Sequence, residues 1–146
     1  KEFPSMEKSD KKTDYTEYAI AWMQAHEEPL PPDKQVALES IPSYLNKKLG
    51  EQNMSTAQLF EAAGTERSTG YKIMNGQLLP SRDSLLRVAF VLKLDVNETQ
   101  YLLKVGRRAK LTPRDSRDAA ILHCIIRHMS LMDANLTLDE AGEEPL

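Results

Sequence analysis

The sequence predicts an all-α protein with a domain of five helices over residues 41–106, a helical arm over residues 14–40 and a helical extension over residues 107–146. Two observations support this prediction. From Asp33 onwards, apolar residues recur at helical spacing and no strand-like alternation competes with them. Capping residues and glycines then divide the chain into segments of helical length. The 146 residues, of which 40% are hydrophobic, suit about one globular domain.

The N-terminal region divides into a leader and one predicted helix. Residues 1–13 are polar; we interpret residues 1–5 as a vector remnant and the rest as a disordered leader. The helix expected over residues 14–26 has an apolar face made by Tyr15, Tyr18, Ala19, Trp22 and Met23. Prolines directly after this segment must end the helix. Its apolar face suits packing on the main domain or docking on a partner, and the residues leave both open.

Capping residues, a proline and glycines predict several further helices. Pro42 suits the first turn of a helix in which apolar residues recur every four positions. Three short helices are expected at about 56–63, 98–105 and 131–141. Their capping pairs are Ser55 with Gln58, Asn97 with Gln100 and Ser130 with Asp133, and their closing glycines are Gly64, Gly106 and Gly142.

Two longer segments carry most of the apolar residues. Residues 81–94 are apolar around most of the helical circumference, which predicts a central, buried helix. Residues 114–128 have an apolar stripe that needs a cover, made by Ala119, Leu122, Ile125, Ile126 and Met129. The helical pair over residues 114–141 can therefore supply a dimer contact or cover the core of the domain itself.

Residues 55–86 carry the functional prediction. A capped helix ends at Gly64, a second short helix ends at Gly76, and the buried helix follows. Two steeply crossing helices need a tight turn, which Gly64 supplies. Leu59 and Ile73 are expected to face the core, and the outward face carries Arg67, Ser68, Tyr71 and Lys72. A helix about 10–12 Å wide fits a DNA major groove about 12 Å wide.

This stretch resembles the Cro/C1-type (XRE) helix-turn-helix family of bacterial and phage repressors. The matching positions are Ser55, Leu59, Gly64, Ile73 and Gly76, followed by Pro80-Ser81 and Leu85-Leu86. The resemblance implies a lambda-repressor-like, five-helix DNA-binding domain. Residues 67–146 also resemble a group of small, poorly characterised bacterial helix-turn-helix proteins with a C-terminal extension. The motifs shared with that group are Gly70-Tyr71, Pro80–Asp83, Arg114–Ala119 and Gly142–Leu146.

Two positions depart from the family pattern. The family usually has Ala where Phe60 stands and Ile or Val where Gly70 stands. These positions face each other in the family, so a large residue opposite a small one can conserve the packed volume. We therefore predict that the Phe60 ring fills the space above Gly70.

The resemblance also implies which residues contact DNA. The base-reading positions are Thr56, Glu66, Arg67, Ser68 and Lys72, and Asn75 matches a phosphate-contacting position of the family. Tyr71 and the basic residues Arg82 and Arg87 are further candidates for phosphate contact. Arg67 is the leading candidate, because an arginine fork can bond O6 and N7 of guanine together. Glu66 can accept from cytosine N4 or simply favour the helix N-terminus. Tyr71 can bond a phosphate or be a half-buried packing residue.

The charge is distributed unevenly along the chain. The whole chain carries −3, but residues 65–117 carry +6 between acidic ends. This is either an electrostatic footprint for a polyanion or chance segregation on a solvated surface. Further basic residues available for phosphate are Lys104, Arg107, Arg108, Lys110, Arg114 and Arg117. The dipeptides Arg114-Asp115 and Arg117-Asp118 suggest ion pairs between neighbours.

Other function classes find little support in the sequence. Cys124, the single cysteine, fits a reducing cytosol, and His123, Cys124 and His128 lack zinc-site spacing. We expect no enzyme activity, cofactor or metal, no membrane span and no signal peptide. The sequence predicts a sequence-specific binder of double-stranded DNA, a transcriptional regulator acting as a homodimer in a bacterial cytoplasm. The alternative is a protein–protein interaction module without DNA binding, with a partner docked through residues 14–26 or 114–141.

Overall fold

The computed structural model describes residues 15–32 and 39–146, and the regular elements in these residues are helices. This confirms the all-α class. The chain divides into two compact units, and the second comprises Glu39–Leu146. The leader predicted over residues 1–13, including residues 1–5, lies outside the described residues.

The first unit contains α2 (Tyr15–Ala25), which confirms the helix predicted over residues 14–26. The Trp22 and His26 rings stack with their centroids 4.0 Å apart, and His26 Nδ1 hydrogen-bonds the Trp22 carbonyl oxygen at 2.8 Å. On the face predicted to be apolar, Ala19 is buried, whereas Met23 is exposed over nearly half of its surface. The face predicted to be apolar is therefore partly open within this unit.

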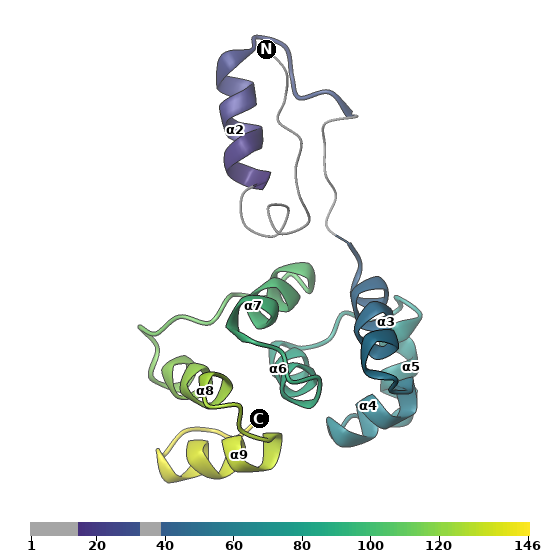
Figure 1. Ribbon diagram of the computed structural model, residues 1–146, viewed down its shortest axis with the longest axis vertical. Helices are drawn as coiled ribbons and strands as arrows, with labels where there is room; N and C mark the ends of the chain where they lie inside the picture. Colours follow the sequence, from purple (N-terminus) through teal and green to yellow (C-terminus); the bar gives the residue numbers. More distant parts are fainter. Residues whose placement is uncertain (1–14, 33–38) are drawn as a thin grey trace. The chain divides into compact units, whose positions relative to one another are not determined.

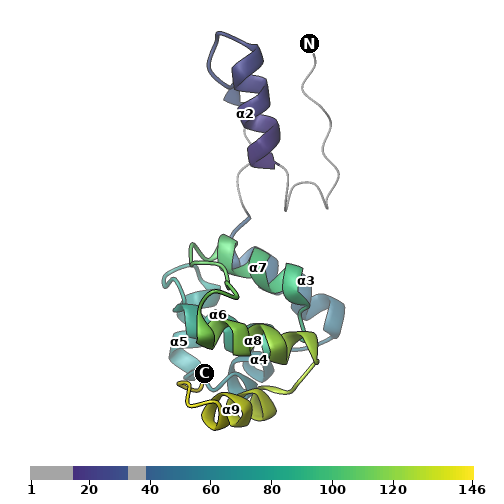
Figure 2. The ribbon, with the colours of Figure 1, turned by 90° about the vertical axis from the view of Figure 1, so that its left-hand side faces the viewer.

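The second unit is built from seven helices, one of which is central (Figure 1). They are α3 (Ile41–Gln52), α4 (Thr56–Ala62), α5 (Arg67–Met74), α6 (Arg82–Val91), α7 (Val96–Val105), α8 (Ser116–Ile126) and α9 (Leu131–Glu140). In Figure 1, α6 lies between α3–α5 on one side and α8 and α9 on the other, and Figure 2 views the unit from the side of α8 and α9. Leu85, Leu86 and Ala89 on α6 are completely or almost completely buried, which confirms the predicted central helix.

Capping side chains fix where most of these helices begin. Ser55 Oγ accepts from the Gln58 N–H at 3.1 Å, and Gln58 Oε1 accepts from the Ser55 N–H at 2.8 Å, as predicted. Helix α7 differs: its capping box is formed by Asp95 and Glu98 instead of Asn97 and Gln100. Gln100 is used elsewhere, because its amide hydrogen-bonds both the N–H and the carbonyl of Leu111.

Gly106 closes α7 for a different reason from the predicted one. Its φ is −80°, and the left-handed residue is Arg107, with φ +57°. A Cβ atom on Gly106 would meet Leu85 Cδ1, so a larger residue there would require the Leu85 side chain to shift where α7 approaches α6. By contrast, Gly64 and Gly142 have φ of +69° and +75°, as expected for helix exits.

Helices α8 and α9 cover the core of their own unit, which confirms one of the two alternatives. The inward side chains Ile121, Cys124, Ile125, Ala134 and Leu138 are all buried. The apolar stripe predicted on α8 is partly wrong, because Ile126 is 59% exposed. The buried face instead runs through Asp118, since a carboxylate at that position is paired inside the fold, as described below.

Candidate nucleic-acid interface

Helices α4 and α5 lie within the stretch that carries the functional prediction, and the turn between them is tight. Gly64 adopts φ +69°, and the Thr65 N–H donates to the Phe60 carbonyl oxygen at 2.8 Å. Leu59 is fully buried and Ile73 is 2% exposed, so both face the core as predicted. The inner face of α5 is thereby held against the rest of the unit.

The prediction that the Phe60 ring fills the space above Gly70 is confirmed. Phe60 is 3% exposed, and a Cβ atom on Gly70 would lie 2.8 Å from Cγ and Cδ2 of its ring. The ring therefore occupies the space that a larger residue at position 70 would need. The two helices are repacked around this contact, and the close approach depends on the missing side chain of Gly70.

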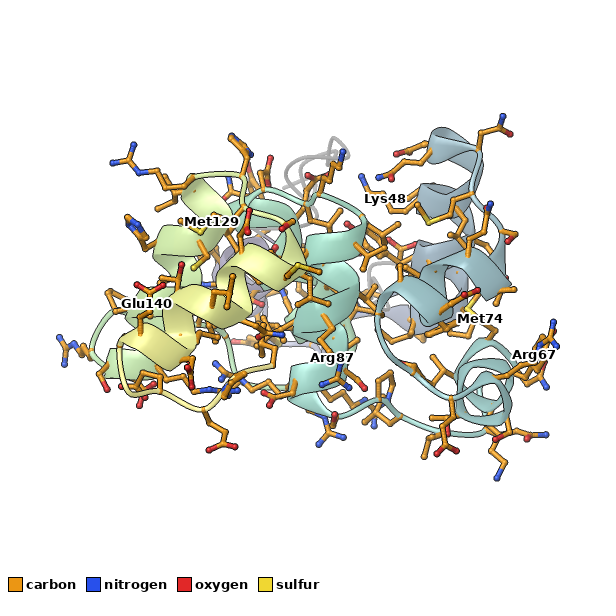
Figure 3. All side chains as sticks on the ribbon, turned by 90° about the horizontal axis from the view of Figure 1, so that it is seen from below. Lys48, Arg67, Met74, Arg87, Met129 and Glu140 are labelled. Carbon is orange, nitrogen blue, oxygen red and sulfur yellow. The ribbon has the colours of Figure 1, made fainter. Side chains whose placement is uncertain are left out.

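The outward face of α5 is open to solvent. Arg67, Ser68 and Lys72 are exposed, and Tyr71 is 48% exposed. In Figure 3, Arg67 extends away from the helices at one end of the unit. Asn75, at the C-terminal cap of α5, is exposed as well. Glu66 occupies the N-cap position without a capping hydrogen bond from its side chain, so its carboxylate is not used to cap α5.

A cleft of about 340 Å³ lies between α4 and α5 on this face. Its lining is formed by Thr56, Ala57, Phe60, Glu61, Thr65, Arg67 and Tyr71. The structure thus brings Thr56 together with Arg67 and Tyr71. Sequence reasoning missed Ala57, Glu61 and Thr65; the i, i+4 spacing of Ala57 and Glu61 could have indicated a shared face. Glu61 lines the cleft together with Arg67, and both side chains are exposed.

Arg82 has an internal role that the sequence did not reveal. Its guanidinium binds both carboxylate oxygens of Asp118, at 2.9 and 2.8 Å, and donates to the carbonyls of Ala109 and Lys110. Arg117 binds both carboxylate oxygens of Asp83 at 3.0 Å. Two Arg-Asp dipeptides, one at the start of α6 and one at the start of α8, therefore exchange partners. We call these four residues the crossed Arg–Asp pairs.

The crossed Arg–Asp pairs correct the predicted ion pairs between neighbours. Arg117 pairs with Asp83 and not with Asp118, and Asp115 caps α8 by accepting from the Asp118 N–H at 2.9 Å. Burial of Asp118 would raise its pKa, but hydrogen bonds from Arg82 and the Thr112 N–H hold that pKa below its usual value. The bond to Asp118 likewise raises the pKa of Arg82, despite opposing desolvation.

Arg87 and Arg108 are also bound within the fold. Arg87 Nε donates to the Ala63 carbonyl at 3.0 Å and its Nη2 donates to Ser84 Oγ at 3.0 Å, which ties α6 to the end of α4. Arg108 Nε donates to the Pro80 carbonyl at 2.9 Å. Of the residues expected to extend the phosphate contact, Arg107, Lys110 and Arg114 are exposed, and Lys104 is partly exposed.

Residues 15–32 and 39–146 contain no group of three or more His, Cys, Asp or Glu side chains placed to hold a metal ion. Within the same residues, no helix combines the length and the apolar content needed to cross a membrane. Comparisons of the chain with protein-family models, with curated proteins and with solved structures gave no significant match.

Proposed function

We propose that the protein binds double-stranded DNA sequence-specifically, with α5 in the major groove, and that it regulates transcription. The observation that carries this proposal is the open, polar outer face of α5 on a helix fixed from behind. Leu59 and Ile73 are buried beneath the pair, and the Phe60–Gly70 contact locks its two helices together. A rigidly presented polar helix is what base readout in the major groove requires.

The proposed contacts come from two neighbouring helices. Base edges would be read by Thr56, Glu66, Arg67, Ser68 and Lys72, and phosphates would be contacted by Tyr71 and Asn75. Arg67 is exposed, so its guanidinium can approach O6 and N7 of guanine. Arg82 and Arg87 are not among the proposed phosphate contacts, because their guanidinium groups bond to other parts of the fold. The proposal includes a homodimer in a bacterial cytoplasm.

Selection of bound fragments from a random DNA pool tests this proposal. We expect one short sequence motif to be enriched, and its affinity to fall steeply with salt, because released counterions set the slope. Equal binding of all sequences would contradict sequence-specific recognition. Absence of binding even at low salt would contradict DNA binding as a whole.

One observation favours a second candidate, a protein–protein interaction module. Tyr71, Leu78 and Leu79 are exposed over 42–48% of their surfaces, and they lie on α5 or in the loop that follows it. Exposed apolar side chains suit a protein partner better than a phosphate backbone. The salt series separates the two candidates, because an interaction module shows no DNA binding at any salt concentration.

A further inference from the structure

A second pocket lies between the C-terminal ends of α6 and α8. Its volume is about 320 Å³, near the lower end of the range for small-molecule sites. The residues that line it are Phe90, Lys93, Leu94, Ile125, His128 and Met129. Phe90, Leu94 and Ile125 are at most 7% exposed, so the apolar floor is part of the packed core. Met129 is held as well, because its sulfur accepts a hydrogen bond from Thr137 Oγ1 on α9 at 3.6 Å.

The two helix ends that form this pocket repeat one arrangement. Each end contributes an apolar residue from its last turn, a basic residue three positions later and a second apolar residue directly after the basic one. After α6, the Leu94 N–H donates to the Ala89 carbonyl oxygen at 3.0 Å. After α8, the Met129 N–H donates to the Cys124 carbonyl oxygen at 3.1 Å. Both helices therefore end in a Schellman motif, whose hydrogen bonds satisfy carbonyls of the last turn.

Lys93 and His128 occupy the left-handed position of these two motifs. Their φ angles are +56° and +55°, although glycine is the residue that usually fills this position. A side chain costs free energy there that glycine does not. The helix dipole favours a basic residue after each helix, but it does not explain why both of them line one apolar pocket. The positions of the two side chains therefore point to a ligand.

The pocket contains charge of one sign. Its lining has two basic side chains and, among the described residues, no acidic one. Within residues 15–32 and 39–146, the side chains of Lys93 and His128 make no hydrogen bond or ion pair, and both are exposed. The cleft beside α5 differs, because Glu61 lies there together with Arg67. An apolar floor with basic N–H donors at its rim matches a ligand that has an apolar body and one anionic group.

We propose that this pocket binds a small aliphatic or aromatic carboxylate. The apolar body of the ligand lies on Phe90 and Ile125, and the carboxylate accepts hydrogen bonds from the Lys93 ammonium group and from a ring N–H of His128. Because both donors are exposed, the carboxylate stays at the solvent boundary and avoids the full cost of burying a charge. Figure 3 shows Met129 and Arg67 on opposite sides of α6, which carries Arg87. The site is thus separate from the proposed DNA-reading face.

Titration of the full chain with octanoate tests the pocket, with methyl groups observed by ¹H–¹³C NMR spectroscopy. We expect saturable shifts of the methyl signals of Leu94, Ile125 and Met129. Uncharged 1-octanol has the same chain length and should bind about tenfold more weakly or less, because it lacks the charge that Lys93 recognises. Absence of saturable shifts would overturn the proposal. Equal affinity for octanol, or an equal shift of the exposed Met132 methyl, would overturn it too.

Glycine substitutions separate ligand contact from helix termination. Lys93→Gly and His128→Gly each remove a donor but retain a residue suited to the left-handed backbone, so the fold should persist in far-UV circular dichroism. Each should raise the octanoate dissociation constant, and Lys93→Gly should do so about tenfold.

Arg107→Gly is the matched control for these variants. Arg107 is an exposed basic residue with φ +57° after α7, and it does not line the pocket. Its replacement should leave octanoate affinity unchanged. An equal loss in this variant would overturn the proposal, as would unchanged affinity in Lys93→Gly. None of these measurements involves DNA, so failure of DNA binding would be recognised separately.

Discussion

Arginine behaves differently in two regions of this molecule. On the outer face of α5, Arg67 extends into solvent. On the opposite side of α4, around the start of α6, Arg82, Arg87 and Arg117 each bond to carboxylates, hydroxyls or carbonyls of the fold. The basic character of residues 65–117 is therefore a poor measure of the charge available to a partner. Local exposure, and not segment charge, identifies the cations that can contact a ligand.

Arg67 can be presented to a partner only if α5 is held rigidly. The contact between Phe60 and Gly70 holds α5 against α4, and its loss should have the largest effect. Phe60→Ala should cost about 3–5 kcal/mol of unfolding free energy, because it empties a buried site. Gly70→Ile should also destabilise, since its Cβ would clash with the ring at 2.8 Å. The double variant should recover part of the loss in urea denaturation. Losses that merely add would show that the two positions do not share one space.

The bound arginines should matter for stability. Arg82→Ala should cost about 3 kcal/mol, near the lower end for a broken buried ion pair, because Asp118 would lose its partner while the Arg82 side chain is only 26% exposed. Arg67→Ala is the matched control and should change stability by less than about 0.5 kcal/mol. Both values are measured by urea denaturation. Equal effects of the two variants would remove the distinction between the two regions.

The exposed arginine should matter for DNA instead. Arg67→Ala should weaken binding to the selected DNA motif by about 1–3 kcal/mol and relax the preference at one base pair. Arg114→Ala, which removes an exposed cation away from α5, should leave that preference intact. Fluorescence anisotropy with the selected motif and single-base variants measures both. An unchanged preference in the Arg67 variant would exclude this residue from base reading.

The pH dependence of stability offers the smallest effect. The pKa of Asp118 is lowered in the folded protein, so its contribution is fully present above the unfolded value of about 3.9 and is lost as pH falls through the lower, folded value. The free energy of unfolding should therefore fall more steeply as the pH is lowered through this range. In the Arg82→Ala variant this part of the slope should shrink. An identical slope in both proteins would argue that Arg82 does not lower the pKa of Asp118.

The helices could be predicted from sequence because their signals are local. Capping side chains and apolar spacing lie within one element, and Ser55 with Gln58 illustrates a signal that holds. Asn97 with Gln100 fails because Asp95 with Glu98 fits the same pattern two residues earlier. The contact between Phe60 and Gly70 could be predicted because the family resemblance places the two positions opposite each other and their sizes are complementary.

The partners of the charged residues were not predictable in the same way. Arg82 and Asp118 are 36 residues apart, and helical spacing carries no information about such a contact. The repeated Arg-Asp dipeptide is the one hint that the sequence offers, and the pairing between neighbours predicted for Arg117-Asp118 is wrong. The cleft beside Arg67 likewise depends on how α4 crosses α5, which is a property of the packed pair.

The crossed Arg–Asp pairs also limit how far this protein can be shortened. A fragment ending at residue 106 would retain Arg82 and Asp83 but lose both Arg117 and Asp118, together with the apolar cover from Ile121 and Leu138. Such a fragment would expose a new hydrophobic surface and strand two charges at the start of α6. The minimal piece that keeps α5 in place should therefore extend through α9.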